Sequence, residues 1–305
     1  MTPVLTNSDD NPYDLLADDN DAGHRWAFGT GFSDTAFTDP LAGIDTSAAP
    51  GLDPAALARY CLGLGDDALI YSHRLQQWVT RMPELEEETA LANVALDLLG
   101  QARMLLARAG GILGRTEDDL AFFRPEPEFR NVRLVEHADR DFAELVGRLL
   151  VFSTWRLALF EALAGTGRPA ATPDPVLAAI AAKAVNELAY HRDYAARWVI
   201  RLGDGTPLSH ARMQSALNAL WPLVPELFQP DPDAPAPVTS AAAGITAFDA
   251  VIDTVLAESS LARPQPAPLP PLGGRAGRDG AHTEALTDIL AELQSVARAH
   301  PDATW

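Results

Sequence analysis

The sequence contains very few of the residues that several classes of protein require. It has one cysteine, Cys61, and one lysine, Lys183, so the other 22 of its 23 basic residues are arginine. A single cysteine excludes an internal disulfide and a zinc site built from cysteines, and we expect Cys61 to be a small apolar residue rather than a catalytic thiol. Because arginine is planar and forked, the cationic groups are suited to paired contacts with carboxylates.

Long apolar runs and a basic surface are also missing. No apolar run reaches the ~18 residues of a membrane-spanning helix. The acidic N-terminus lacks the basic start and apolar core of a secretory signal. The net charge of −19 argues against a nucleic-acid binder, which needs a basic face. We therefore expect a cytoplasmic protein that contacts neither nucleic acid nor membrane.

The residues that are abundant predict helices. Alanine and leucine dominate, and no segment with a strand period appears, so we predict an all-α fold with four long helices and several shorter ones. Residues 1–52 lack a sustained period and predict a mobile acidic extension, although the aromatic patch HRWAFGTGF leaves docking on another surface open. Residues 53–305 form the predicted helical domain. In it we expect one long helix to begin at Asp53-Pro54, a second to end at Gly110-Gly111, and two more over 142–163 and 175–202.

A stripe of three polar residues in KAVNELAYH raises the question of a metal site. Lys183, Glu187 and His191 are four residues apart, so they share one side of a helix. Di-iron carboxylate bundles bind their metals with one Glu from each of two helices and a Glu-x-x-His pair from each of the other two. A lysine beside such ligands is out of place, because its charge would repel the metal.

A count of ligands over the long helices argues against a working di-iron site. The first bundle helix, in GLGDDALIYSHRLQQWVTR, has His73 in its middle but carboxylates only at the start of that stretch, Asp66 and Asp67. The second has Asp97 and Gln101 at mid-length without a histidine, and the third has no carboxylate between Glu144 and Glu161. The fourth has Glu187 and His191 at a spacing of four rather than three. We therefore expect no catalytic, cofactor-binding or metal-ligating residue in this chain.

Three interpretations of the stripe remain open. The favoured one is an internal polar cluster in which Lys183 supplies the positive charge that a metal would otherwise provide. The second is a surface ion pair between Lys183 and Glu187, which would contribute only tenths of a kcal/mol (about 0.3). The third is a metal site. The favoured cluster would consist of Asp97, Gln101, Lys183, Glu187 and His191.

Several long blocks resemble a known family. They are DDALIYSHRLQQW, PELEEETALANVALDLLGQAR, EDDLAFFR, EFRN, NELAYHRDYAARWVIRLGDGTPLSHARMQ, GRAGRDGAHTEAL and HPDATW. Together they resemble the family of structural (C) subunits of bacterial phenylacetyl-CoA 1,2-epoxidases, the multicomponent monooxygenases of aerobic phenylacetate breakdown. The resemblance covers residues 63–305, and nothing carries over to the first 55 or so.

The resemblance implies a ferritin-like helical protein that is catalytically silent and structural. In that family a related catalytic subunit holds the di-iron centre and the substrate, and a separate flavin and iron–sulfur reductase supplies electrons. This chain would then stabilise and orient the catalytic subunit in a hetero-oligomer, and it would be poorly soluble when expressed alone. Two rival hypotheses are a catalytic di-iron oxygenase and a free-standing helical scaffold.

Overall fold

The computed structural model describes residues 39–47, 51–82, 84–165, 172–234, 241–265 and 275–303. Two compact units are separated at Ala42 and Gly43, and the larger unit spans residues 43–305. Most of the predicted N-terminal extension, including its aromatic patch, lies outside the described residues, so its mobility stays a prediction. Over the described ranges the secondary structure is helical and contains no strand, which confirms the all-α prediction.

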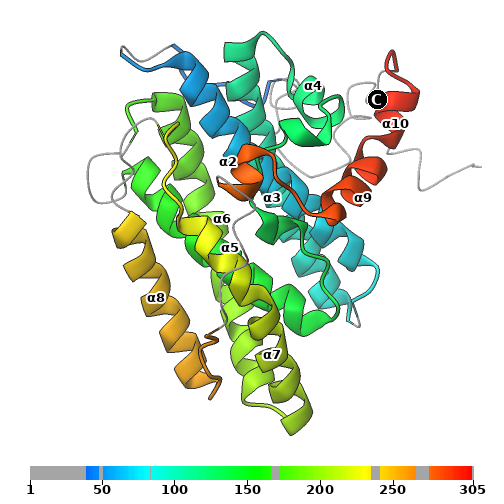
Figure 1. The fold of residues 1–305 in the computed structure, drawn as a ribbon, viewed down its shortest axis with the longest axis vertical. Coiled ribbons are helices and arrows are strands. Elements are labelled where there is room, and N and C mark those ends of the chain that lie inside the picture. Colours follow the sequence, from blue (N-terminus) through cyan, green and yellow to red (C-terminus); the bar gives the residue numbers. More distant parts are fainter. Residues whose placement is uncertain are drawn as a thin grey trace, which may run out of the picture. The chain divides into compact units, whose positions relative to one another are not determined.

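Four long helices form the centre of the larger unit, and we call them the helical core (Figure 1). They are α2 (Pro54–Val79), α3 (Leu85–Leu113), α5 (Phe142–Ala164) and α6 (Pro175–Gly203). The closest packing joins α2 to α3 and α5 to α6, and α3 also packs against α6. The core therefore consists of two helix pairs that meet at a seam between α3 and α6.

Two of these helices begin where the sequence predicts, because each has an aspartate cap followed by proline. Asp53 accepts a hydrogen bond from the Ala55 backbone N–H at 3.0 Å. Asp174 accepts one from the Leu177 N–H at 2.9 Å. Proline fits the first turn because its missing N–H has no helical partner there.

The predicted end of α3 at Gly110-Gly111 is wrong. The helix continues to Leu113 and ends at Gly114, which has a left-handed φ of 68°. Gly110 serves close packing instead, since a Cβ at that position would lie 2.3 Å from the carbonyl oxygen of Arg115. A glycine does end this helix, as the sequence indicates, but the terminating residue is Gly114, the last of the three glycines.

Shorter helices surround the core. They are α4 (Glu117–Phe122), α7 (Pro207–Leu220), α8 (Ala241–Glu258), α9 (Glu284–Leu293) and α10 (Ser295–Ala299), with 3₁₀ segments η2 (Glu126–Glu128), η3 (Arg133–Glu136), η4 (Trp221–Phe228) and η5 (Ala276–Asp279). Both α7 and α8 pack against α5 and α6, whereas α9 packs against α2. Pro222 and Pro225 remove two N–H donors after α7, so the chain continues from α7 as the 3₁₀ segment η4.

Buried arginine–carboxylate pairs join the connecting segments to α2. Arg124 binds Asp66 bidentately, with Nη1 3.0 Å from Oδ2, and both side chains are buried. Arg278 of η5 donates to Asp67 at 2.7 Å. Removing one partner of such a pair leaves an uncompensated buried charge, so these contacts fix the C-terminal segment against the core.

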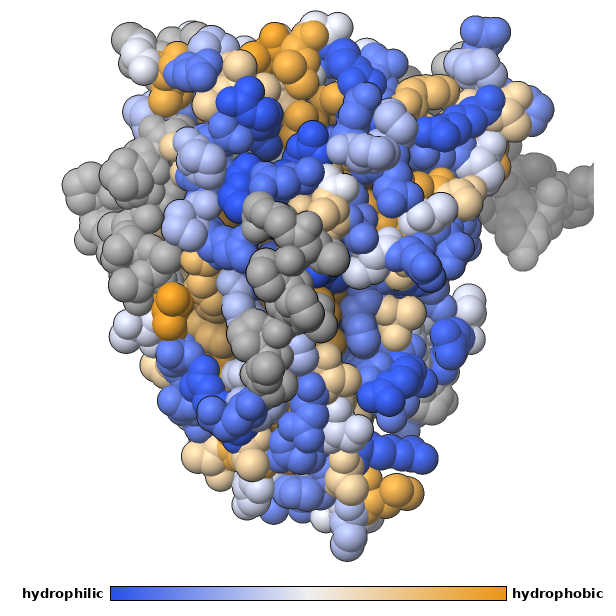
Figure 2. All heavy atoms as spheres, in the orientation of Figure 1, coloured by the Kyte–Doolittle hydropathy of each residue, from blue (hydrophilic) through white to orange (hydrophobic). Residues whose placement is uncertain are grey.

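The helix α3 is apolar enough for comparison with a membrane span. By length and composition alone it could cross a bilayer, but half of its apolar window is buried against the rest of the protein. Its packing against α2 and α6 accounts for that composition. Some apolar side chains remain exposed, including Leu85 at 71% and Leu96 at 51%. On the face drawn in Figure 2, hydrophilic side chains predominate and hydrophobic ones form separate patches.

Candidate functional site

The α3–α6 seam brings together four of the five residues in the predicted cluster. His191 Nε2 lies 2.9 Å from Asp97 Oδ2. One turn away, Gln101 donates from Nε2 to Glu187 at 3.0 Å. The side chains of Gln101 and His191 are fully buried, whereas Asp97 keeps 37% of its side chain exposed. The seam is therefore polar at mid-length and opens to solvent on the Asp97 side.

The cation at this seam is Arg156 of α5, which the sequence analysis did not select. Its Nε donates to Gln101 Oε1 at 3.0 Å, and its two terminal nitrogens donate to the Leu64 carbonyl at 3.2 Å each. One terminal nitrogen lies 4.0 Å from Asp67 Oδ2. A continuous polar line thus runs from Asp67 through Arg156 and Gln101 to Glu187, and every long helix contributes to it.

Lys183 does not belong to this cluster, and the prediction that it lies inside the core is wrong. Its side chain is exposed and forms no hydrogen bond or ion pair with a described residue, although its charge acts on Glu187 and opposes the desolvation that raises the pKa of that carboxyl group. Four residues along an α-helix rotate by about 400°, which leaves a drift of about 40° per step. The stripe therefore winds from the buried His191, past the half-buried Glu187, to the exposed Lys183.

Burial controls the electrostatics of the cluster. Desolvation raises the pKa of Glu187, the charge of Asp97 raises it further, and the hydrogen bond from Gln101 opposes both effects. Desolvation lowers the pKa of Arg156 to about 10 while the Asp67 charge opposes that shift, so the guanidinium stays positive at neutral pH. The Nδ1 atom of His191 is buried without a hydrogen-bond partner.

The side chains at this seam do not suit a di-iron centre. Such a centre needs carboxylates from four helices and two histidines. Here α5 contributes a buried guanidinium and α3 an amide, which leaves Asp97, Glu187 and His191 as the potential ligands near the cluster. The fixed positive charge of Arg156 acts on Glu187 and disfavours a metal cation there.

Within the described ranges, one group of histidine and acidic residues is close enough to share a metal, and it lies elsewhere. His137, Asp139 and Glu144 offer ligand atoms within 4.8 Å of one another. Arg148 binds the Asp139 carboxylate, and Arg140 binds that of Glu144. Since both carboxylates are already neutralised by arginines, we assign no metal to this group.

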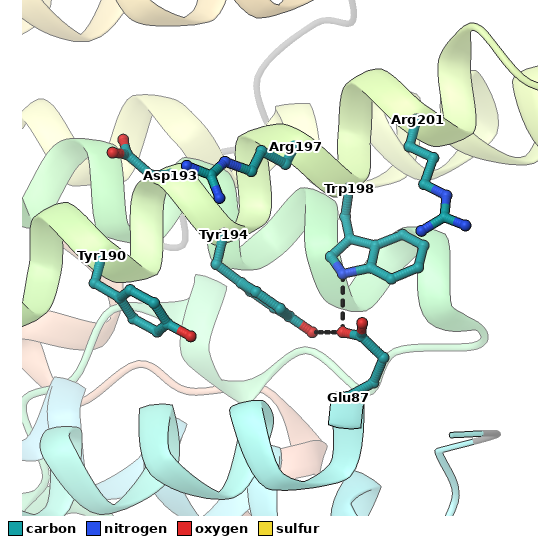
Figure 3. Close-up of a pocket in the computed structure, with 7 residues that line it drawn as sticks. All are labelled: Glu87, Tyr190, Asp193, Tyr194, Arg197, Trp198 and Arg201. Carbon is teal, nitrogen blue, oxygen red and sulfur yellow. Dashed lines mark hydrogen bonds between the residues drawn. The ribbon is translucent and has the colours of Figure 1, made fainter. Parts of the chain in front are cut away.

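A surface cavity lies further along the same seam, between the start of α3 and the end of α6 (Figure 3). It measures about 320 Å³ and is lined by Glu87, Tyr190, Asp193, Tyr194, Arg197, Trp198 and Arg201. Tyr194 and Trp198 both donate to one carboxylate oxygen of Glu87, at 2.9 Å for Trp198 Nε1. Two helices therefore form the walls of this cavity, and a hydrogen-bond network joins them.

The residues that sequence reasoning missed had a weak signal. Arg156 stands alone among apolar residues in LLVFSTWRLALF, and a charge in such a run predicts a buried partner. The cavity had no such signal, since its glutamate and its aromatic residues are about 100 positions apart in the chain. Cys61 is buried as expected, and burial raises its pKa to about 12, which makes a reactive thiolate unfavourable.

Comparison with known proteins agrees with the sequence blocks that suggested a family. Residues 44–305 match the family described as phenylacetic acid catabolic protein. The chain belongs to this family. It is also 39% identical over 258 residues to the C subunit of 1,2-phenylacetyl-CoA epoxidase from Escherichia coli K12, an alignment that covers 82% of this chain and 99% of that protein. The resemblance inferred from the sequence is therefore confirmed at the level of the family.

Proposed function

We propose that this protein is a non-catalytic structural subunit of a phenylacetyl-CoA 1,2-epoxidase complex in the cytoplasm. The observation that carries the proposal is Arg156. Its buried guanidinium is hydrogen-bonded to Gln101 at the α3–α6 seam, beside the residues that were the candidate metal ligands. The similarity to the C subunit of the Escherichia coli epoxidase supports assignment to such an epoxidase complex. The core of four long helices supports assignment to the ferritin-like four-helix bundles.

In this proposal the chemistry belongs to a partner. A catalytic subunit of the same oxygenase carries the di-iron centre and the acyl-CoA substrate, and a flavin and iron–sulfur reductase feeds electrons to it. The present chain holds neither cofactor and stabilises the catalytic subunit through a helix-to-helix interface. Exposed apolar side chains on α3, such as Leu85 and Leu96, are consistent with a surface that a partner covers.

Co-expression with the catalytic subunit from the same organism tests the proposal. We expect the two chains to copurify, iron to be found in the partner alone, and epoxidation of phenylacetyl-CoA to require both chains and the reductase. About two iron atoms in this chain after separation would instead favour a catalytic di-iron oxygenase. Failure to copurify would favour a free-standing scaffold.

Expression without a partner provides a second test. An unpartnered chain with exposed apolar side chains should aggregate or be poorly soluble, and the partner should restore it by mass action. Size-exclusion chromatography of the chain alone and of the co-expressed pair measures this difference. A monodisperse monomer at high concentration would contradict the proposed role.

A further inference from the structure

The cavity at the end of the α3–α6 seam has a rigid wall. Glu87 of α3 accepts hydrogen bonds from both Tyr194 and Trp198 of α6. The Trp198 ring also packs edge-on against Phe142 of α5, with 4.9 Å between the ring centroids. Because three core helices hold these aromatic rings, a ligand would cost the protein little conformational freedom on binding there.

Unpaired positive charge lines the outer side of the same cavity. Arg197 forms no hydrogen bond, ion pair or ring contact with any residue that the structure describes. Arg201 places its guanidinium 4.8 Å from the centre of the Trp198 ring. The cavity lining also contains two carboxylates. Glu87 accepts two hydrogen bonds from uncharged donors, and Asp193 accepts two from Arg192. Neither carboxylate forms an ion pair with Arg197 or Arg201, so the two guanidinium groups and the aromatic rings are available to a ligand.

The cavity suits protein side chains better than a free small molecule. A volume of about 320 Å³ is at the lower end for ligand pockets, which are also mostly apolar. Its lining of tryptophan, tyrosine and arginine is the composition of protein–protein hot spots. Tyr190 lies at one end of the row of lining side chains (Figure 3), and its exposure of 54% leaves the ring accessible to a partner.

We infer that this cavity is a docking point for a carboxylate-bearing segment of the metal-bearing catalytic partner. The inference rests on the proposed function and adds the place of contact. The chain as a whole has a net charge of −19 and repels acidic surfaces, so an acidic segment is attracted where arginines without carboxylate partners gather. The partner's carboxylate would bind Arg197 and Arg201, and an adjacent apolar side chain would cover Tyr190.

Two variants on α6 test this inference, and each has a matched control on α7. Arg197→Glu reverses the charge of a guanidinium without an ion pair. Its control is Arg212→Glu, since Arg212 is also exposed and forms no hydrogen bond or ion pair with a described residue. Tyr190→Ala removes the exposed ring, and its control is Leu208→Ala, whose side chain is 62% exposed. Thermal unfolding of the four variants should match that of the wild type, because none of these side chains is buried.

The measurement is the dissociation constant between this chain and the co-expressed catalytic subunit, as a function of salt. We expect Arg197→Glu to weaken binding about tenfold or more and to flatten the salt dependence. Tyr190→Ala should weaken it about fivefold, and the two controls should change it less than about twofold.

Each outcome separates the inference from the proposed function. Wild-type binding with four indistinguishable variants overturns this docking point and leaves the proposed function standing. Weaker binding in the two cavity variants alone supports both. Absence of wild-type binding overturns the proposed function and, with it, the docking point.

Discussion

The inner and outer sides of α6 differ in how their polar and charged side chains are paired. On the inner side Glu187 and His191 each contact a residue of α3, and a buried arginine from α5 completes the network. On the outer side Lys183 and Arg197 are exposed, and neither forms a hydrogen bond or a close ion pair with a described residue. The difference teaches that the protein excludes its only lysine from the interior and uses arginine there, because one guanidinium satisfies several acceptors in fixed directions.

The largest expected effect comes from removing the interior cation. Arg156→Ala leaves Gln101 Oε1 and the Leu64 carbonyl without their donor and creates a cavity, so it should lower the free energy of unfolding by roughly 3–5 kcal/mol. Urea unfolding measures the loss. The exposed Arg212→Ala is the matched control and should change stability by less than about 0.5 kcal/mol. Equal losses in the two variants would contradict the conclusion that the buried arginine stabilises the fold more than an exposed one.

A smaller effect is expected from a buried pair of a histidine and a glutamate. His282 Nδ1 lies 2.7 Å from Glu136 Oε1, and both side chains are buried. Burial opposes the charged form of His282, but the hydrogen bond and charge of Glu136 outweigh it and raise the pKa of the imidazole. The stabilisation is thus fully present below the unfolded-state pKa of about 6.5 and is lost as pH rises through the higher folded-state value.

His282→Gln tests this pH dependence. We expect it to cost on the order of 1–2 kcal/mol at pH 6 and to lower the pH dependence of stability above that pH. The control is His73→Gln, because His73 forms a similar pair with Glu292 at 3.3 Å on the surface. Thermal melts at several pH values compare the two. A larger effect in His73→Gln would reverse the predicted order of interior and surface pairs.

A still smaller change is expected at Glu187. Its raised pKa means that the charged carboxylate is less favourable in the folded protein, a cost that is relieved as pH falls through the folded-state pKa. Glu187→Gln keeps an acceptor for Gln101 and removes the charge, so stability at pH 7 should stay within about 1 kcal/mol of the wild type or rise slightly. Chemical denaturation measures it. A loss of several kcal/mol would show that the carboxylate charge is needed in the cluster.

The smallest effect should come from Lys183→Ala. An exposed lysine that attracts Glu187 only through solvent-screened charge contributes less than about 0.5 kcal/mol to folding. Urea unfolding, as for Arg156→Ala, allows the losses in free energy of unfolding to be compared directly between the two variants. A loss near ~3 kcal/mol would restore the interior position that the sequence pattern favoured.

Local sequence signals predicted helix starts well and helix ends less well. Asp53 and Asp174 mark the starts of α2 and α6 because a cap is a contact between near neighbours in the chain. The end of α3 was misplaced because Gly110 and Gly114 give the same local signal. Only the approach of the Arg115 carbonyl to Gly110 distinguishes the packing glycine from the terminating one.

The sequence predicted most residues of the candidate site but not the residue that supplies its positive charge. Helical spacing selected Asp97 with Gln101 on one helix and Glu187 with His191 on another, and the structure joins these pairs across the seam. The same spacing also selected Lys183, because a four-residue repeat cannot show how far the stripe rotates away from the core.

The sequence by itself determined the helical class, the positions of the aspartate caps and the preference for arginine in paired contacts. These follow from composition and from interactions within a few residues. Only the tertiary structure decided which cation is buried. Gln101 and Arg156 are 55 residues apart and meet only when the α2–α3 pair packs against the α5–α6 pair, so no periodicity in the chain could record their contact. Burial then selects the guanidinium, because it can donate to the amide and the backbone carbonyl together, whereas Lys183 remains hydrated on the outer side of α6.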